Sequence, residues 1–328
     1  MLRLTLNVLA GVVFIATRVD AVVVKNLTDG EFKMVTSVFK PIPPRFETNN
    51  NPLTPEKIAL GKKLYHEKKL SLGGDLTCAS CHGLDTFGVD NKQFSTGHKG
   101  QLGGRNAPTV LNAGLHVAQF WDGRAADLEE QALGPVLNPV EMAMPDAASV
   151  EKVLKTTSDY VASFQLAFPG EKDPVTFKNM GKAIAAFERT LTTPSRFDEF
   201  LAGDRQALNA IEQHGLRTFM NAGCVSCHSG VGVGGGTFQK LGAVKPFPTK
   251  DLGRFEVTKA EGDKHLFKVP SLRNIEKTGP YFHDGSIKTL DAAIMAMGKH
   301  QLGKDLSKEE VKSIATFLKA LTGRVPKV

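Results

Sequence analysis

The sequence has little of several features that mark other classes of protein. Alternation of apolar and polar residues, the pattern of a β-strand, is nearly absent, which predicts a mainly α-helical fold with few or no strands. After the first 21 residues no apolar run is long enough to cross a bilayer, so we expect no membrane span in the mature chain. The net charge is +7, but basic residues never occur more than two in a row, which argues against a nucleic-acid partner.

Cysteine is also scarce, since the 328 residues contain only four. All four belong to two copies of one motif, Cys-x-x-Cys followed directly by His: Cys78, Cys81 and His82, and then Cys224, Cys227 and His228. Two thiols at this spacing form thioether bonds to the vinyl groups of one porphyrin, and the adjacent imidazole is a suitable iron ligand. The sequence therefore predicts two covalently bound haem c groups, with His82 and His228 as iron ligands.

Other readings of these motifs explain the sequence less well. A structural zinc site would need both cysteine pairs on one metal, and it would not explain the histidine after each pair. A thioredoxin-like dithiol needs a βαβ context, which is not visible around either motif. The glycines between 230 and 236 could suggest a dinucleotide loop, but they follow a haem motif instead of a strand and are better explained as a flexible loop.

The N-terminus has the pattern of a secretory signal peptide. Within residues 1–21, Arg3 is the charged region, 6–16 is the apolar region, and small residues precede a cleavage site at Ala21. An uncleaved anchor is the alternative. Because haem c is normally attached outside the cytoplasmic membrane, export and the haem motifs agree, and we expect a periplasmic protein.

The rest of the chain is predicted to form two cytochrome c-like domains, 22–203 and 204–328. Residues 22–51 contain three closely spaced prolines and are predicted to be an extended arm. Helices are expected after Thr54 and around Ile211, each just before a haem motif, and another from Asp173. The final helix, with Ser307 as its N-cap, belongs to the second domain but could pack on the first.

Several longer segments resemble the bacterial di-haem cytochrome c peroxidases, and the similarity covers most of residues 52–321. The matching segments are His98, 104–112 (GRNAPTVLN), 119–125 (QFWDGRA), 138–142 (NPVEM), 269–275 (VPSLRNI), 280–285 (PYFHDG) and 297–303. The resemblance implies an enzyme that reduces hydrogen peroxide to water. It also implies a homodimer whose electrons come from a small cytochrome c or a cupredoxin.

By this resemblance the N-terminal haem is the peroxidatic one. His98 matches the distal iron ligand that leaves to admit peroxide, and Glu141 matches the acid–base residue over the distal face. Such a residue is chemically reasonable, because one peroxide oxygen must lose a proton and the other must gain one as the O–O bond breaks. Gln131 matches a position nearby. From the residues alone, Glu141 could equally be a surface charge at a helix end.

The same resemblance makes the C-terminal haem the site of electron entry, with Met297 as its sixth ligand. A helix from Thr289 would put Met297 and its competitor Met295 on different faces, although Met297 could also be an ordinary core residue. Trp121, the only tryptophan, matches a position between the two haems. The residues that match an interdomain calcium site are Asn106, Thr278 and Pro280.

Two further functional classes are open. Related di-haem oxidases mature a tryptophan-derived cofactor on a partner protein, but they carry tyrosine where this sequence has Met297. The sequence has three tyrosines, and none is near that position: Tyr65, Tyr160 and Tyr281. A pure electron carrier, with both irons permanently six-coordinate, would not require Glu141 or the His98 segment.

Overall fold

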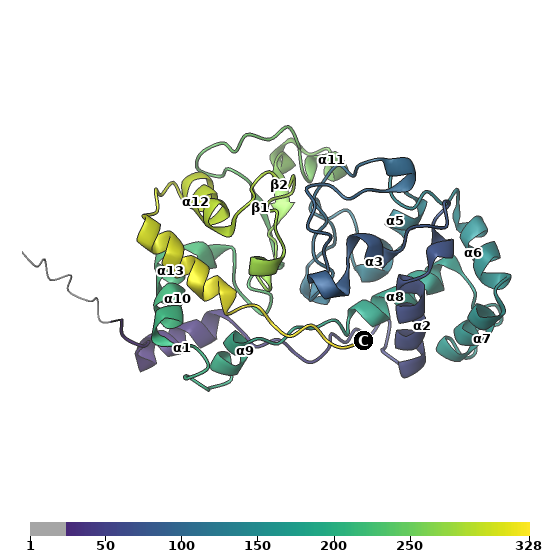
Figure 1. The fold of residues 1–328 in the computed structure, drawn as a ribbon, viewed down its shortest axis with the longest axis horizontal. Coiled ribbons are helices and arrows are strands. Elements are labelled where there is room, and N and C mark those ends of the chain that lie inside the picture. The colour runs from purple at the N-terminus through teal and green to yellow at the C-terminus, as the bar shows by residue number, and fades with distance from the viewer. Residues whose placement is uncertain (1–23) are drawn as a thin grey trace, which may run out of the picture.

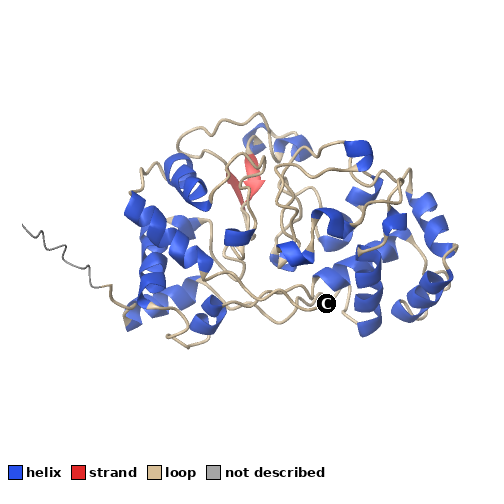
Figure 2. Cartoon of the chain, viewed as in Figure 1, coloured by secondary structure: helices blue, strands red, loops and turns tan. Residues whose placement is uncertain are grey.

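The computed structural model describes residues 24–328 (Figure 1), so the predicted signal peptide lies outside the described residues. Two helical lobes lie side by side and are joined along one edge by extended segments that cross each other. Helices are peripheral, and long loops fill the region between the lobes (Figure 2). None of the helices in residues 24–328 is long and apolar enough to cross a membrane.

The chain is mainly helical, as predicted, with one small antiparallel sheet. The helices of the first lobe are α2 (Pro55–Tyr65), α3 (Cys78–Cys81), α4 (Leu128–Gln131), α5 (Gly134–Leu137), α6 (Ala147–Lys155), α7 (Ser158–Ala167) and α8 (Phe177–Glu188). The other elements are α1 (Asp29–Val38), α9 (Arg196–Leu201), α10 (Ala210–Ala222), α11 (Phe255–Thr258), α12 (Leu290–Gln301), α13 (Lys308–Lys319), β1 (Phe238–Lys240) and β2 (Leu266–Lys268).

Each predicted haem motif follows a helix that packs closely on a second helix. Gly61 of α2 lies so close to α8 that an added Cβ would be 1.9 Å from the Ala183 carbonyl oxygen. Gly215 of α10 lies equally close to α13, where a Cβ would be 2.1 Å from the Ser313 carbonyl oxygen. These glycines allow the backbones of each pair to approach, and the pairs form the centres of the two cores.

The N-terminal segment differs from the predicted extended arm, because it contains α1. Thr28 caps this helix, and its side chain and that of Glu31 form a reciprocal capping box. Leu27, Val35 and Phe39 are buried in the second lobe's core together with α9, α10 and α13. Residues 24–39 therefore pack on the lobe that contains the second haem motif.

The C-terminal helix α13 packs on α10 in the second lobe, and only the residues after it reach the first. The Arg324 amide donates to the Pro194 carbonyl, and Val325 packs against the first lobe's core. The two ends of the described chain thus cross between the lobes (Figure 1). The division at residues 203 and 204 stays a prediction, while the core of the second lobe also includes Phe197 and Phe200.

Most of the predicted helix starts are confirmed. Thr54, Thr289 and Ser307 are N-caps whose side chains accept backbone N–H groups. The helix expected from Asp173 begins later, at Phe177, because the Thr176 hydroxyl caps it by accepting from the Asn179 amide at 3.1 Å.

Candidate active site

The first Cys-x-x-Cys-His motif lies on α3 and the turn after it. The His82 amide donates to the Cys78 carbonyl, which holds the imidazole directly after the helix. His82 Nδ1 is 3.2 Å from the Gly88 carbonyl oxygen, so this nitrogen carries the proton and Nε2 is left as the acceptor. Burial lowers the pKa of His82 and therefore favours the neutral imidazole. This is the form and tautomer that an iron ligand requires.

A cavity of about 250 Å³ lies between the loop after Trp121 and the α4–α5 region. Arg124, Asn138 and Glu141 line it together with Glu130. Burial raises the pKa of Glu141, although Arg124 and a 2.9 Å hydrogen bond from Asn138 Nδ2 oppose the shift. The cavity thus combines a carboxyl group that can exchange a proton with a guanidinium that can stabilise negative charge.

Arg124 is held in place from two sides. Its guanidinium lies 3.5 Å from the centre of the Phe120 ring, and Nη1 donates to both carboxylate oxygens of Asp122 at 3.0 Å. Burial raises the pKa of the Cys81 thiol, and the charges of Asp90 and Glu141 add to this shift. Gln131 is not among the residues that line the cavity, where its neighbour Glu130 is found.

His98 lies in a short loop that packs directly on the Glu141 turn. The loop is closed by the pairing of Thr96 with Leu102, and the Gly97 amide donates to the Gln101 carbonyl at 2.8 Å. The His98 amide donates to two carbonyl oxygens of the turn, those of Val140 at 3.1 Å and Glu141 at 2.8 Å. The His98 side chain is half-buried and does not line the Glu141 cavity. The loop and the turn therefore move as one unit unless these bonds break.

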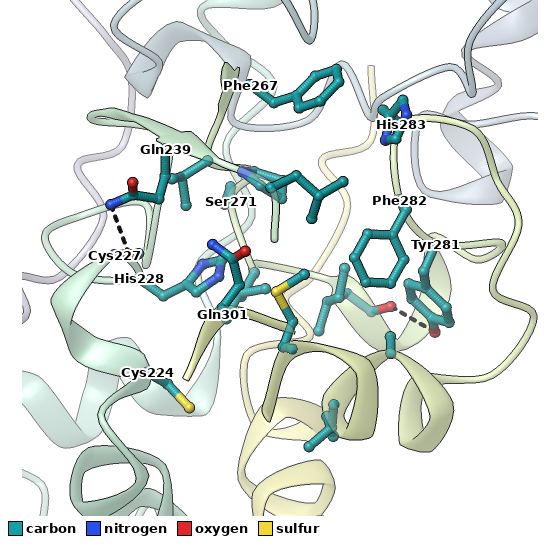
Figure 3. Close-up of a pocket in the computed structure, with 18 of the residues that line it drawn as sticks. Cys224, Cys227, His228, Gln239, Phe267, Ser271, Tyr281, Phe282, His283 and Gln301 are labelled. Carbon is teal, nitrogen blue, oxygen red and sulfur yellow. Dashed lines mark hydrogen bonds between the residues drawn. The ribbon is translucent and has the colours of Figure 1, made fainter. Parts of the chain in front are cut away.

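The second motif opens onto a mostly apolar cavity of about 220 Å³ (Figure 3). Cys224, Cys227 and His228 line one side of it, and Met297 from α12 also lines it. Met295 is 48% exposed, so the two methionines do occupy different faces of α12. Burial lowers the pKa of His228 to about 4, which favours the neutral imidazole.

The His228 surroundings also fit a bound metal group. Nδ1 of His228 is buried and has no hydrogen-bond partner among residues 24–328, a costly arrangement for a polar atom. The cavity gathers two thiols, an imidazole and a thioether from separate elements, and these groups suit a covalently attached haem. In the same part of the chain, no three His, Cys, Asp or Glu side chains are grouped so that they could hold a metal ion.

Trp121 joins the two lobes at the edge of this cavity. Its indole Nε1 donates to the Asn106 carbonyl at 2.9 Å, and its own carbonyl accepts from the Lys268 amide of β2 at 2.8 Å. The Asn106 amide donates in turn to the His283 carbonyl. His283 is buried, and its ring stacks on Phe267 with 4.3 Å between the ring centres. The indole is therefore held by a backbone carbonyl of the first lobe, and the Trp121 backbone is held by the second lobe.

A buried ion network strengthens the same interface. Arg105 of the first lobe contacts Asp122 at 2.5 Å and Asp251 of the second lobe at 2.6 Å. Although burial lowers the pKa of Arg105, these carboxylates raise it overall, so the guanidinium stays charged. Truncation of one member of such a network leaves its partners buried and unpaired, which costs several kcal/mol.

The residues expected to bind calcium lie around the same cavity. Asn106, Thr278 and Pro280 all line it. Asn106 Nδ2 donates to the Lys92 carbonyl at 2.8 Å, which leaves its side-chain oxygen available to a cation. Tyr281 lines this cavity as well, although its sequence position is distant from Met297. Its hydroxyl donates to the Ile275 carbonyl at 3.1 Å (Figure 3).

The di-haem cytochrome c peroxidase family model matches residues 55–206. The cytochrome c551 peroxidase of Nitrosomonas europaea is 49% identical, with 84% of this chain and 83% of the relative covered. The cytochrome c551 peroxidase of Pseudomonas aeruginosa is 44% identical, with 92% and 88% covered. This chain belongs to the di-haem cytochrome c peroxidase family. It is a peroxidase, an oxidoreductase whose family implies two haem c groups.

The peroxidase also resembles MauG and a MauG-like protein. The methylamine utilization protein MauG of Methylophilus methylotrophus is 36% identical over 85% of this chain and 86% of the relative. The structure of a MauG-like protein associated with microbial copper homeostasis superposes with a TM-score of 0.76 at 32% identity, covering 87% and 94% of the two chains.

Several residues in these sites were not predicted from the sequence to have a role. Arg124 and Arg105 lie inside the segments that carried the family resemblance, so their positions in the sequence were a usable signal. Lys268 and His116 line the second cavity, and no motif singled them out.

Proposed function

We propose that this peroxidase reduces hydrogen peroxide to two waters at the first motif. The observation that carries the proposal is the cavity lined by Glu141, Arg124 and Asn138, where Asn138 Nδ2 donates to the Glu141 carboxylate at 2.9 Å. A pure electron carrier would have no use for a buried carboxyl group and a guanidinium over one haem. The named relatives are cytochrome c551 peroxidases, which agrees with this assignment.

The reaction consumes one peroxide, two electrons and two protons, and it releases two waters. When bound, the haem supplies the electrons and the iron at which peroxide binds. Glu141 removes the proton from the inner peroxide oxygen and delivers it to the outer oxygen, which leaves as water. Its raised pKa suits both halves of this transfer. Arg124 stabilises the negative charge that develops as the O–O bond breaks.

Electrons would enter through the second site, where His228 and Met297 would hold the haem iron. Thioether ligation favours ferrous iron and raises the reduction potential, as an electron-receiving site requires. Trp121 lies at the edge of the same cavity, between the lobes, and provides the route toward the first motif. The donor is a small cytochrome c or a cupredoxin, bound at the second lobe.

His98 would hold the first iron, kept in place by its loop until the second haem is reduced. The two hydrogen bonds from the His98 amide tie this loop to Glu141, so displacement of His98 would also rearrange the carboxyl group. Gln131 would act from just outside the cavity. In this mechanism one loop movement opens the iron and completes the proton-transfer site.

The remaining assignments follow from the family and from the sequence. Asn106, Thr278 and Pro280 bind calcium between the lobes, where carbonyl and amide oxygens are suitable ligands for this cation. The mature enzyme is a periplasmic homodimer with haem domains 22–203 and 204–328, and residues 1–21 are the export signal. The MauG-type maturation activity is less well supported, because Met297 faces the cavity and the Tyr281 hydroxyl is engaged by a backbone carbonyl.

The test is peroxide-dependent oxidation of a reduced small cytochrome c by enzyme that is either fully oxidised or reduced beforehand by one electron. Activity only after reduction would support both the peroxidase and the His98 gate. Activity in both states would keep the peroxidase and remove the gate. No turnover in either state, with calcium and several donors present, would refute the proposed function.

A further inference from the structure

Lys268 is a buried cation without a carboxylate partner. It lies at the end of β2, is only 5% exposed, and makes no ion pair within residues 24–328. The ammonium group has one side-chain contact, at 3.3 Å to Nδ1 of His116. An ammonium carries three donor hydrogens, so two of them lack an assigned acceptor.

An unpaired charge at this depth is costly, and proteins usually neutralise or pair it. Burial lowers the pKa of Lys268 to about 8, which leaves the group mostly protonated at neutral pH. Burial and the neighbouring Lys268 lower the pKa of His116 well below its ordinary value, so His116 is neutral and accepts through Nδ1. His116 therefore orients the ammonium but does not balance its charge.

The position of Lys268 indicates where the missing anion belongs. Lys268 and His116 both line the cavity that contains His228 and Met297. The chain continues from Lys268 through Val269 to Pro270, and the Gly235 amide donates to the Val269 carbonyl beside the second motif. The anion must therefore be part of whatever fills this cavity.

We propose that Lys268 binds a propionate carboxylate of the haem attached at Cys224 and Cys227, with His116 positioning the ammonium. This inference rests on the haem attachment in the proposed function. A haem c carries two carboxylates and is the one group expected in this cavity that could pair with a buried cation.

The experiment compares Lys268→Met, which removes the charge, with Lys268→Arg, which keeps it. Lys240→Met is the matched control, because Lys240 is exposed and its strand β1 pairs with β2. Haem content is first counted for each purified protein. The reduction potential of the second haem is then measured by spectroelectrochemical titration. Redox-difference infrared spectra are recorded on protein whose haem propionates carry ¹³C, introduced with carboxyl-labelled 5-aminolevulinate.

We expect Lys268→Met to lower the reduction potential of the second haem, since a nearby positive charge favours ferrous iron. The labelled carboxylate bands should shift in the same variant. Lys268→Arg and Lys240→Met should leave both readouts near those of the wild type. If methionine prevents folding, Lys268→Gln is the milder neutral substitution and should give the same two shifts.

Unchanged potential and unchanged carboxylate bands in a neutral variant that still holds two haems would overturn the inference. A wild-type protein with fewer than two haems would instead refute the haem assignment in the proposed function. The two failures are thus distinguishable without any measurement of turnover.

Discussion

Replacement of Gly97 by alanine should separate the His98 loop from the Glu141 turn. A Cβ at residue 97 would lie 1.9 Å from the Val140 carbonyl oxygen, far inside normal contact. The φ angle of Gly97 is −107°, which any residue can adopt, so the effect comes from the clash alone. The methyl group must push the loop outward by at least about 1 Å, and this movement strains both hydrogen bonds of the His98 amide.

Overpacking of this kind typically costs about 1–3 kcal/mol. If the cost falls on the closed loop alone, about 2 kcal/mol shifts the closed–open equilibrium roughly 30-fold toward the open form. In the proposed mechanism this shift makes the first iron accessible without prior reduction. Gly97→Ala should therefore bind cyanide faster than the wild type when both are fully oxidised.

Gly104→Ala is the control, because it lies after the same loop and a Cβ there would meet nothing within 4 Å. It should match the wild type in cyanide binding and in urea unfolding. Gly97→Ala should lose stability, gain access to the iron, or both. If Gly97→Ala equals the control in both assays, the close contact between the loop and the turn is refuted.

Three further outcomes are expected. Glu141→Gln should lower kcat by about 10²–10⁴-fold while both haems remain bound, and a loss below threefold would contradict proton transfer by Glu141. Asp198→Asn should lower the free energy of unfolding by about 3–5 kcal/mol, because it leaves the buried Arg273 guanidinium unpaired. Burial alone would raise the pKa of Asp198, but Arg273 and backbone donors lower it overall, so this stability is present above the ordinary pKa of 3.8 and is lost as the pH falls below it. Urea unfolding at several pH values measures this, and a flat profile for both proteins would contradict it. Met297→His should lower the reduction potential of the second haem while Met295→His leaves it unchanged, and the reverse result would exchange the ligand assignment.

The fold was predictable where the signal is local. Thr54, Thr289 and Ser307 are residue types that cap helix N-termini, and the three helices begin directly after them as predicted. The helix α1 was not predicted, because the three prolines that follow it indicate an extended chain. Thr28 and Glu31 have the spacing of a capping box and would have shown it.

The sites were predictable only in part. The spacing of the two motifs and the helical period that turns Met297 away from Met295 are readable from the sequence. The cavity lined by Glu141 and Arg124 is formed by separate loops. No periodic pattern in the sequence predicts which loops come together. The burial of Lys268 is even less predictable from the sequence, because lysine is normally exposed.

The crossing of the chain ends has a consequence for biogenesis. A chain is synthesised from its N-terminus, yet the first helix α1 has its packing partners in α9, α10 and α13 near the other end. Phe39 contacts Phe197, which contacts Phe317, so this aromatic row closes only after the last helix has arrived. The core of the second lobe thus cannot form from residues 204–328 alone, and its completion should be the late, whole-chain step of folding.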